Sequence, residues 1–229
     1  MDVVALTCGG ARWPLPPAAT AVMPVPARPG RSDLAPVLES LAGRRLVVCG
    51  TDADLAAVAQ RLLRDELLGT VEVGYVPTSA ASAVARLWAL PVVPADAAAV
   101  ALGSPAGPVP LLRDDAGGVL VGRGVVHAVD GVVYCDDDLV LRGRAARIEV
   151  SPDLERGLVV RVVARRASGL LGRRVRVAAG RAVQLGLAPT DVLRDGVADR
   201  TRDRWTWYRH TEDLRLARGP VSSPAGDCR

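Results

Sequence analysis

The chain has 229 residues, of which 49% are hydrophobic, so it is long enough to bury a substantial core as one large domain or two small ones. All 29 basic residues are arginine, which excludes the sites that depend on a lysine, namely the P-loop, the Schiff base and the lysine of protein kinases. A net charge of +4 with 25 interspersed acidic residues does not by itself indicate nucleic acid, and four scattered cysteines support neither a zinc site nor a disulfide framework.

The N-terminal part of the chain predicts two strands and a helix. An apolar run at residues 2–7 predicts the first strand. Residues 22–25 predict a second strand at a sheet edge, because Pro24 cannot donate a ladder hydrogen bond. Apolar residues at helical spacing then predict a helix from Ser32 or Asp33 to residue 42, with Ser32 as its cap.

Two strand-turn-helix units follow. A β-branched run at residues 46–49 leads into a turn at residues 50–54 and then into a helix with apolar residues at helical spacing. A second strand at residues 71–76 leads into a turn at residues 77–82 and a helix that ends before Pro91. Such repeated units predict a parallel sheet covered by helices, with both turns at the edge of the sheet where ligands bind.

Beyond Pro91 the sequence becomes β-rich. From residue 109 to about residue 187, short β-branched runs are separated by turn signals such as Asp130-Gly131 and Arg142-Gly143. This pattern predicts an all-β domain, either a sandwich or a flattened barrel. The expected fold is therefore an α/β N-terminal domain with a parallel sheet, followed by an all-β, sandwich-like second domain.

Arginine and valine alternate in this β-rich half, as in residues 174–177, Arg-Val-Arg-Val. The alternation predicts an antiparallel strand with one solvated face. The alternative is a clustered arginine face that binds anionic lipid headgroups, phosphates or nucleic acid, because guanidinium groups bind phosphate in a bidentate manner. Nucleic acid is the weakest of these hypotheses.

Three stretches of the sequence resemble a known family. Residues 50–54 read Gly-Thr-Asp-Ala-Asp, residues 77–82 read Pro-Thr-Ser-Ala-Ala-Ser before Ala85-Arg86, and Asp195-Gly196 follows an apolar run. They resemble the catalytic domain of bacterial diacylglycerol and sphingoid-base kinases, relatives of NAD kinase. In that family the corresponding turns read Gly-Gly-Asp-Gly-Thr, Pro-x-Gly-Thr-Gly-Asn-Asp before Ala-Arg, and Asp-Gly-Glu.

The resemblance implies a cofactor set and roles for named residues. It implies ATP and Mg²⁺ as cofactors, phosphoryl transfer to a lipid hydroxyl, Asp195 as the general base and Asp52 as the metal-binding residue. The residues that it implies for cofactor binding are Gly50, Thr51, Asp52, Asp54, Thr78, Ser79, Ser82 and Arg86. It also implies a C-terminal segment that returns to the first domain.

The glycines and one acid of the family pattern are replaced. Thr51, Ala53, Ala80 and Ala81 add β-carbons where a triphosphate needs close approach to bare backbone, and Val197 stands in place of the glutamate.

Each retained acid also has a structural interpretation. Asp52 or Asp54 can cap the helix that follows. Asp195-Gly196 can be a hairpin turn.

Two functions from different classes follow. The first is an ATP- and Mg²⁺-dependent lipid kinase with divergent loops. The second is a non-catalytic relative, a pseudokinase, that binds a nucleotide or lipid or acts as a scaffold. The sequence predicts a cytoplasmic protein, with peripheral membrane contact and a homodimer as open alternatives, because no apolar run is long enough to span a membrane. The expected segments are an α/β nucleotide-binding-like domain at 1–95, a β-rich domain at 96–204, a returning C-terminal strand segment at 205–218 and a disordered tail at 219–229.

Overall fold

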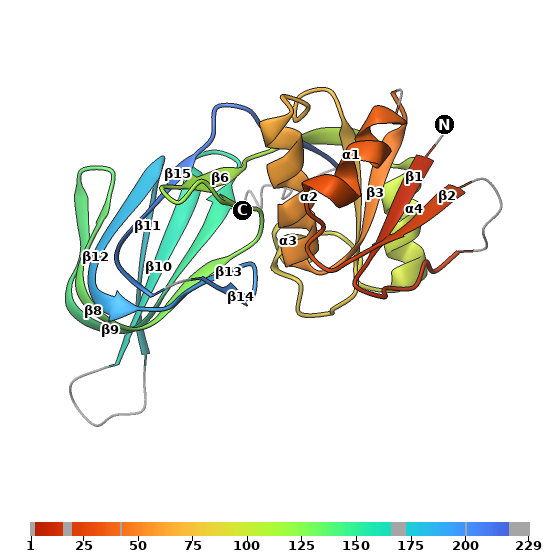
Figure 1. The fold of residues 1–229 in the computed structure, drawn as a ribbon. Coiled ribbons are helices and arrows are strands. Elements are labelled where there is room, and N and C mark those ends of the chain that lie inside the picture. Colours follow the sequence, from red (N-terminus) through yellow and green to blue (C-terminus); the bar gives the residue numbers. More distant parts are fainter. Residues whose placement is uncertain (1–2, 16–19, 42, 166–172, 200, 220–229) are drawn as a thin grey trace, which may run out of the picture.

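The computed structural model contains two sheets, each with its own hydrophobic core (Figure 1). One belongs to an α/β domain and the other is antiparallel throughout, which confirms the predicted fold class.

Of the helices in the described part of the chain, none has the length and apolar character that a bilayer crossing requires. Residues 220–229 of the expected tail lie outside the described residues. The structure describes residues 3–15, 20–41, 43–165, 173–199 and 201–219.

The first sheet has six strands in the order β2-β1-β3-β4-β16-β5. Its first five strands run parallel, and β5 runs antiparallel to β16. Apolar runs make β1 and β3 buried along their whole length, as expected for strands covered on both faces. Pro24 lies in β2 at the edge of the sheet, as predicted. The bounds are β1 Val3–Cys8, β2 Thr20–Val25, β3 Arg45–Gly50, β4 Glu72–Pro77, β5 Ala106–Val109 and β16 Leu214–Ala217.

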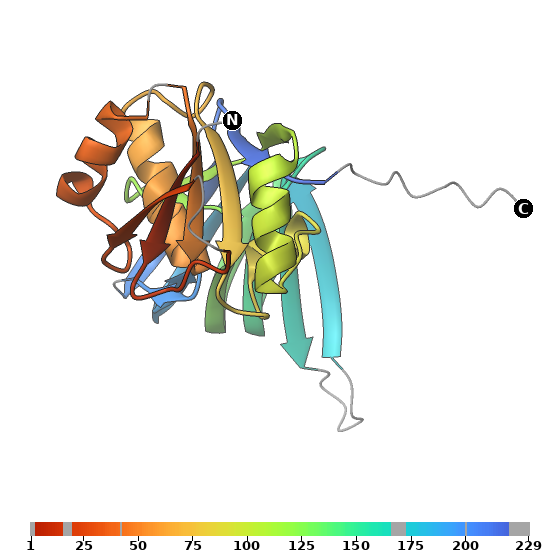
Figure 2. The same ribbon diagram turned by 90° about the vertical axis from the view of Figure 1, so that its right-hand side faces the viewer.

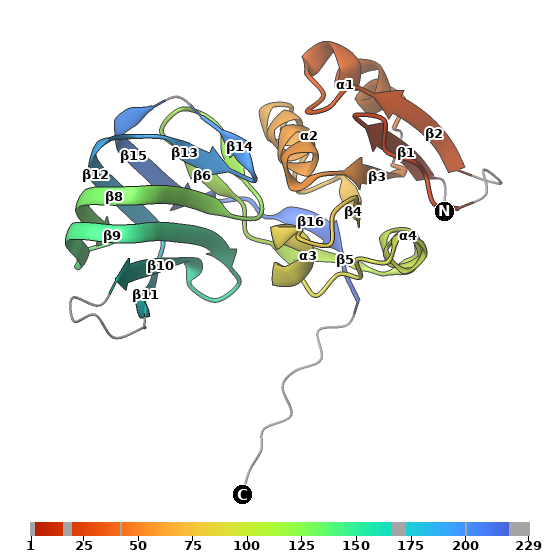
Figure 3. The ribbon, with the colours of Figure 1, turned by 90° about the horizontal axis from the view of Figure 1, so that it is seen from below.

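Helices cover both faces of this sheet (Figure 3). α1 and α2 pack on one face through Leu34, Leu55 and Leu62, and the alanines of α4 pack on the other face. The predicted cap at Ser32 is wrong, because the N-cap is Gly30, whose N–H donates to Asp33 over 2.7 Å. The bounds are α1 Arg31–Glu39, α2 Asp52–Arg64, α3 Ala83–Leu87 and α4 Pro94–Gly103.

The second sheet has ten strands, eight of them in the order β11-β10-β9-β8-β12-β15-β6-β7, and β13 pairs with both β8 and β14. Its strands curve around one apolar core (Figure 3). The bounds are β6 Leu112–Asp114, β7 Val119–Leu120, β8 Gly124–Cys135, β9 Asp138–Asp153, β10 Gly157–Arg165, β11 Arg173–Gly180, β12 Ala182–Thr190, β13 Val192–Arg194, β14 Val197–Ala198 and β15 Arg202–Arg209.

The aromatic strand β15 belongs to this second sheet. Trp205 and Trp207 are buried in its core, with ring centroids 5.6 Å apart. They stabilise the interior of the β-rich domain.

The chain passes from one sheet to the other twice. α4, which extends beyond residue 95, packs on the first sheet and β5 pairs within it, so the chain leaves that sheet after Val109. It returns at Leu214, where β16 enters between β4 and β5. Apolar residues of β16 explain the return, because Leu214 and Leu216 are buried in the core of the first domain.

Candidate functional site

Asp52 and Asp195, the two acids singled out by the sequence, line the same pocket. This central pocket has a volume of about 290 Å³ and lies between the turn after β3, the turn after β4 and the hairpin β13–β14. Ser79 and Ser82 line it as well. Topology explains how the first two turns meet, because β3 and β4 are adjacent parallel strands whose carboxyl ends lie at one edge. Asp195 reaches the pocket from the β-rich domain, in the turn between β13 and β14.

The Asp52 carboxylate is surrounded by donors from its own domain. Its Oδ1 accepts from the hydroxyls of Tyr75, at 2.9 Å, and Ser82, at 2.5 Å. Its Oδ2 accepts from the backbone N–H groups of Ala83, at 2.6 Å, and Val84, at 3.4 Å. Asp52 therefore holds the beginning of α3 against the beginning of α2 and the end of β4.

Asp54 caps its own helix. Its Oδ2 accepts from the N–H of Thr51 at 2.7 Å and from the Thr51 hydroxyl at 2.8 Å, which completes a capping box. Its Oδ1 accepts from the N–H of Arg28 at 2.6 Å. Gly50 is required beside it, because a β-carbon at this position would lie 2.6 Å from Asp54 Oδ2. Of the two uses that the sequence left open for Asp54, its contacts support capping.

The remaining residues of the second turn differ in their surroundings. Ser82 is buried and caps α3 by accepting from the N–H of Ala85 over 3.0 Å. Thr78 and Ser79 are exposed; Thr78 donates its N–H to Gly50, and Ser79 Oγ accepts from the N–H of Ala81. Arg86 is exposed on α3 and is not part of the pocket lining.

Asp195 occupies the turn of the hairpin β13–β14. Arg194 pairs with Val197 across the turn, and both Asp195 and Gly196 have positive φ, 47° and 85°, as a two-residue type I′ turn requires. The predicted hairpin turn is therefore present.

The Asp195 side chain points inward and is clamped. Its oxygens accept from the N–H groups of Val121, Gly122 and Arg123 over 2.8–3.1 Å. Burial raises its pKa to about 7 despite these hydrogen bonds, which lower it, and the nearby Asp52 charge raises it further. At neutral pH the group is therefore partly protonated.

These contacts do not fit Mg²⁺ at the expected position. A magnesium ion needs carboxylate lone pairs directed at it in near-octahedral geometry. Asp52 already accepts from four donors and Asp195 from three, so a cation there would have to displace hydrogen bonds that hold α3 and the segment 121–123 in place.

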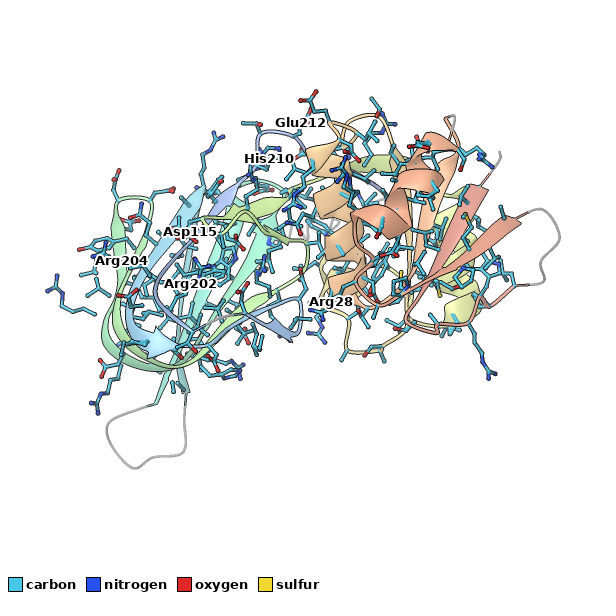
Figure 4. All side chains as sticks on the ribbon, viewed as in Figure 1. Arg28, Asp115, Arg202, Arg204, His210 and Glu212 are labelled. Atoms are coloured by element: carbon cyan, nitrogen blue, oxygen red, sulfur yellow. The ribbon has the colours of Figure 1, made fainter. Side chains whose placement is uncertain are left out.

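A second pocket, here called the arginine pocket, lies between α2 and the hairpin β13–β14. Its volume is about 320 Å³, and Asp195 is the only acidic residue of its lining among the described residues. Figure 4 shows Arg28 on the side of the α/β domain that faces the β-rich domain. The lining also includes alanines of α2 and Gln60. Its five arginines are Arg28, Arg31, Arg61, Arg64 and Arg194.

Sequence reasoning missed this pocket. Arg61 and Arg64 carried one signal, because residues three apart lie on the same helix face. The position of Arg28 depends on Asp54, which is 26 residues away, and on a left-handed φ of 51°. Nothing local in the sequence indicates that contact.

A third pocket, the outer pocket, adjoins Asp52 and Asp195 on the side of the β-rich domain. It has a volume of about 320 Å³ and is lined by Arg123, His127 and Arg147 among others. Glu149 lies 2.9 Å from Arg147 and 3.8 Å from Arg123. Asp195 thus lines all three pockets.

Solved structures share this architecture, although no protein-family model matches the sequence and no curated protein matches it significantly. The chain is similar to a diacylglycerol kinase from Bacillus anthracis strain Sterne, with 12% identity, a TM-score of 0.70, and coverage of 97% of this chain and 98% of that one. It is also similar to an NAD kinase from Archaeoglobus fulgidus in complex with ATP, with 11% identity, a TM-score of 0.55, and coverage of 95% and 94%. The chain therefore has the two-domain fold seen in these diacylglycerol and NAD kinases.

Proposed function

We propose that this protein is a non-catalytic relative of the lipid kinases that binds a phosphate-bearing nucleotide in the arginine pocket. The observation that carries the proposal is the gathering of five arginines around one cavity between the two domains. Guanidinium groups bind phosphate oxygens in a bidentate manner and remain charged at every physiological pH. ATP, with its chain of phosphates, is the ligand whose chemistry matches this lining best.

The charge balance of the arginine pocket favours an anion. Arg61 is paired with Asp65, and Arg194 is paired with Asp114 and Asp199. Within the described parts of the chain, the guanidinium groups of the remaining three arginines of the pocket form no ion pair. The one acid of the lining, Asp195, is partly protonated at neutral pH because burial raises its pKa to about 7. The pocket therefore carries an excess of positive charge.

The shape of the pocket also suits a nucleotide. Ala53, Ala56 and Ala57 present a shallow apolar surface of α2, and Gln60 adds an amide beside it. Small-molecule sites commonly combine such apolar walls with a few polar groups in cavities of roughly 300–1,000 Å³. A base can lie on the alanines while the phosphates meet the arginines.

Loss of catalysis follows from how the two acids are used. Phosphoryl transfer depends on positioning and on charge neutralisation, usually by metal ions. Here Asp52 and Asp195 are acceptors for protein donors, and Thr51 and Ala53 add side chains in the first turn. These residues stabilise the cleft, which supports binding without transfer.

A lipid kinase is the second candidate, and one observation favours it. The pKa of Asp195, raised to about 7, suits a general base, which works best when its pKa is near the working pH. Asp195 also lines the arginine, central and outer pockets. A phosphate donor and a lipid acceptor could therefore occupy different pockets that both reach Asp195. In that reaction Asp195 would accept the proton of a lipid hydroxyl.

The test is the thermal stability of the full chain with ATP, first without and then with Mg²⁺. ATP at about 100 times its Kd stabilises by roughly 2.7 kcal/mol, which is a rise in Tm of about 5–11 °C for a chain of this size. We expect this rise without metal, and at least tenfold weaker ATP binding in the double variant Arg28→Gln/Arg64→Gln. Arg142→Gln/Arg144→Gln is the matched control, because it removes the same two charges from exposed positions of β9.

Two results would contradict the proposal in different ways. If ATP leaves the Tm unchanged, the nucleotide site does not exist. If the chain transfers phosphate from ATP to diacylglycerol in mixed micelles, and Asp195→Asn abolishes this transfer, the protein is a lipid kinase. We expect ATP binding and no phosphorylated lipid.

A further inference from the structure

Strand β11 forms one border of the β-rich domain. It stands at the end of the strand order and pairs with β10 along its full length. On its other side it pairs with no strand among those that the structure describes. Figure 2 shows β11 in cyan at one side of the sheet, next to β10. Its outer backbone groups are therefore available for a further strand.

The two faces of this border differ in chemistry. Val175 and Val177 are 45% and 56% exposed and lie on the same face as their cross-strand partners on β10, Val163 and Arg161. These two valines are neighbours on one face of an edge strand, so they leave apolar surface exposed to solvent.

The opposite face of β11 carries Arg174 and Arg176, both exposed. The guanidinium of Arg176 is held in place, because its Nη1 donates to the carbonyl of Val140 over 3.2 Å. Neither β10 nor β11 contains an aspartate or glutamate. The N-terminal half of β11 is therefore basic, with no acid on β10 or β11 to neutralise it.

We propose that β11 is a docking edge for an extended protein segment in which acidic and apolar residues alternate. Such a segment adds one strand to the sheet through main-chain hydrogen bonds, as in other cases of β-strand addition. Because side chains alternate along a strand, its acids face Arg174 and Arg176 while its apolar residues cover Val175 and Val177. Both the arginines and the exposed valines of β11 thus gain complementary side chains.

The two-faced pattern separates this partner from a membrane. A lipid surface contacts one face of a sheet at a time, so it would meet either the valines or the arginines of β11. An added strand lies beside β11 and reaches both faces at once. The observed alternation therefore favours a strand.

A second copy of the chain is a poor partner for this edge. Pairing β11 with another β11 brings together two arginine-rich strands without an acid on either, and like charges opposite one another destabilise a sheet. Arginines on an edge oppose self-association and at the same time select a partner of opposite charge. This interaction is independent of the nucleotide proposal, because none of the β11 residues named here lines the arginine pocket.

Fluorescence anisotropy of labelled peptides with the full chain tests the proposal. The probe is a ten-residue peptide of alternating glutamate and valine. One control peptide has the same composition with glutamates and valines in separate blocks, and a second alternates glutamine with valine. We expect the alternating glutamate–valine peptide to bind at least tenfold more tightly than either control, with weaker binding at higher salt. Within residues 174–179, the alternate amides that point away from β10 should gain protection from hydrogen exchange when it binds.

Variants separate the two faces. Arg174→Gln/Arg176→Gln and Val175→Ser/Val177→Ser should each weaken binding of the peptide at least tenfold. The double variant Arg142→Gln/Arg144→Gln, which removes the same charge from exposed positions of β9, should bind as the parent chain does. All of these side chains are exposed, so the melting temperature checks that each variant is folded.

Three outcomes would overturn the proposal. The first is equal affinity for the alternating and block peptides, which would mean that charge alone attracts them. The second is unchanged binding in both β11 variants. The third is binding to phosphatidylglycerol vesicles that depends on β11 while the peptide does not bind, which would make this edge a membrane contact.

Discussion

The Asp52 carboxylate lies 2.5 Å from the Ser82 hydroxyl, which in turn caps α3 by accepting from the N–H of Ala85. The acid at the beginning of α2 thus positions the cap of the next helix. In this arrangement Asp52 stabilises the fold around the cleft, and its carboxylate accepts hydrogen bonds from two hydroxyls and two backbone N–H groups.

Replacing Asp52 with alanine should destabilise the protein in the absence of any ligand. The change leaves two hydroxyls and two backbone N–H groups without their acceptor, at a cost of about 2 kcal/mol, or roughly 4–8 °C in Tm. Asp96→Ala is the matched control, because Asp96 is exposed in the first turn of α4 and should cost less than about 1 kcal/mol. A Tm that stays the same or rises in Asp52→Ala would indicate an acid kept free for a ligand.

Gly50→Ala should destabilise the α/β domain through a direct clash. The new β-carbon would lie 2.6 Å from Asp54 Oδ2 and 3.0 Å from Asp54 Cβ, and Asp54 is held by Thr51 and Arg28. We expect a loss of at least about 2 kcal/mol in urea unfolding. Gly69→Ala, with no atom within 4 Å of the added carbon, should change the free energy of unfolding by less than about 1 kcal/mol. Equal losses in the two variants would refute the clash.

Asp195 should make the folded protein less stable as the pH rises from 4 to 7. Its pKa is raised from 3.8 to about 7 on folding, chiefly by burial, so between these values the folded protein holds a proton that the unfolded chain has lost. This group alone contributes a decline of up to about 1.4 kcal/mol per pH unit, which ends above pH 7.

Urea unfolding between pH 4 and pH 8 measures this contribution. Asp195→Asn should lower stability overall, because its amide faces backbone N–H donors, and it should remove the decline between pH 4 and 7. Asp115→Asn, at an exposed position, should keep the parent's pH dependence. Parallel pH profiles for the parent and Asp195→Asn would show that the carboxyl does not titrate in this range.

Arg45 should be among the most costly arginines to replace. It is 4% exposed, and its guanidinium donates to the carbonyls of Ala101, Leu102 and Ser104 and pairs with Glu72 at 2.7 Å. Arg45→Met keeps the bulk of the side chain but leaves the end of α4 and Glu72 without these donors, at a cost of about 3–5 kcal/mol.

The exposed Arg144 provides the comparison for Arg45. Arg144→Met removes an ion pair with Asp130 in which the arginine side chain is 86% exposed, so calorimetry should find a loss below about 1 kcal/mol. A similar loss in both variants would mean that burial of Arg45 does not matter.

Much of the first domain could be predicted from local patterns. The β-branched runs of β3 and β4 and the helical spacing in α2 are strong signals, and Pro24 correctly marked β2 as an edge strand. The start of α1 was harder to predict from the sequence, because the N-cap Gly30 has no side chain that indicates a cap. Its backbone N–H donates to Asp33 instead.

The site was predictable in its location but not in the use of its groups. The family resemblance singled out Asp52 and Asp195 and left open whether they meet in one cleft, and both do line the central pocket. That Asp52 accepts from the Ser82 cap and from the first N–H of α3, which begins 31 residues later, depends on tertiary packing. The raised pKa of Asp195 likewise depends on burial by segments distant in the sequence.

The place of β16 constrains the order in which this chain can fold during synthesis. β5 pairs with β16 and, among the described strands, with no other, so the first sheet is incomplete until residue 217 has left the ribosome. The α/β domain therefore lacks β16, and one side of β4 stays unpaired, while the whole β-rich domain is synthesised. Closing such a distant pairing is slow and leaves an exposed edge in the interim. A chain that stops before Leu214 lacks the four residues of β16 and should aggregate, because these residues close a domain that began more than 200 residues earlier.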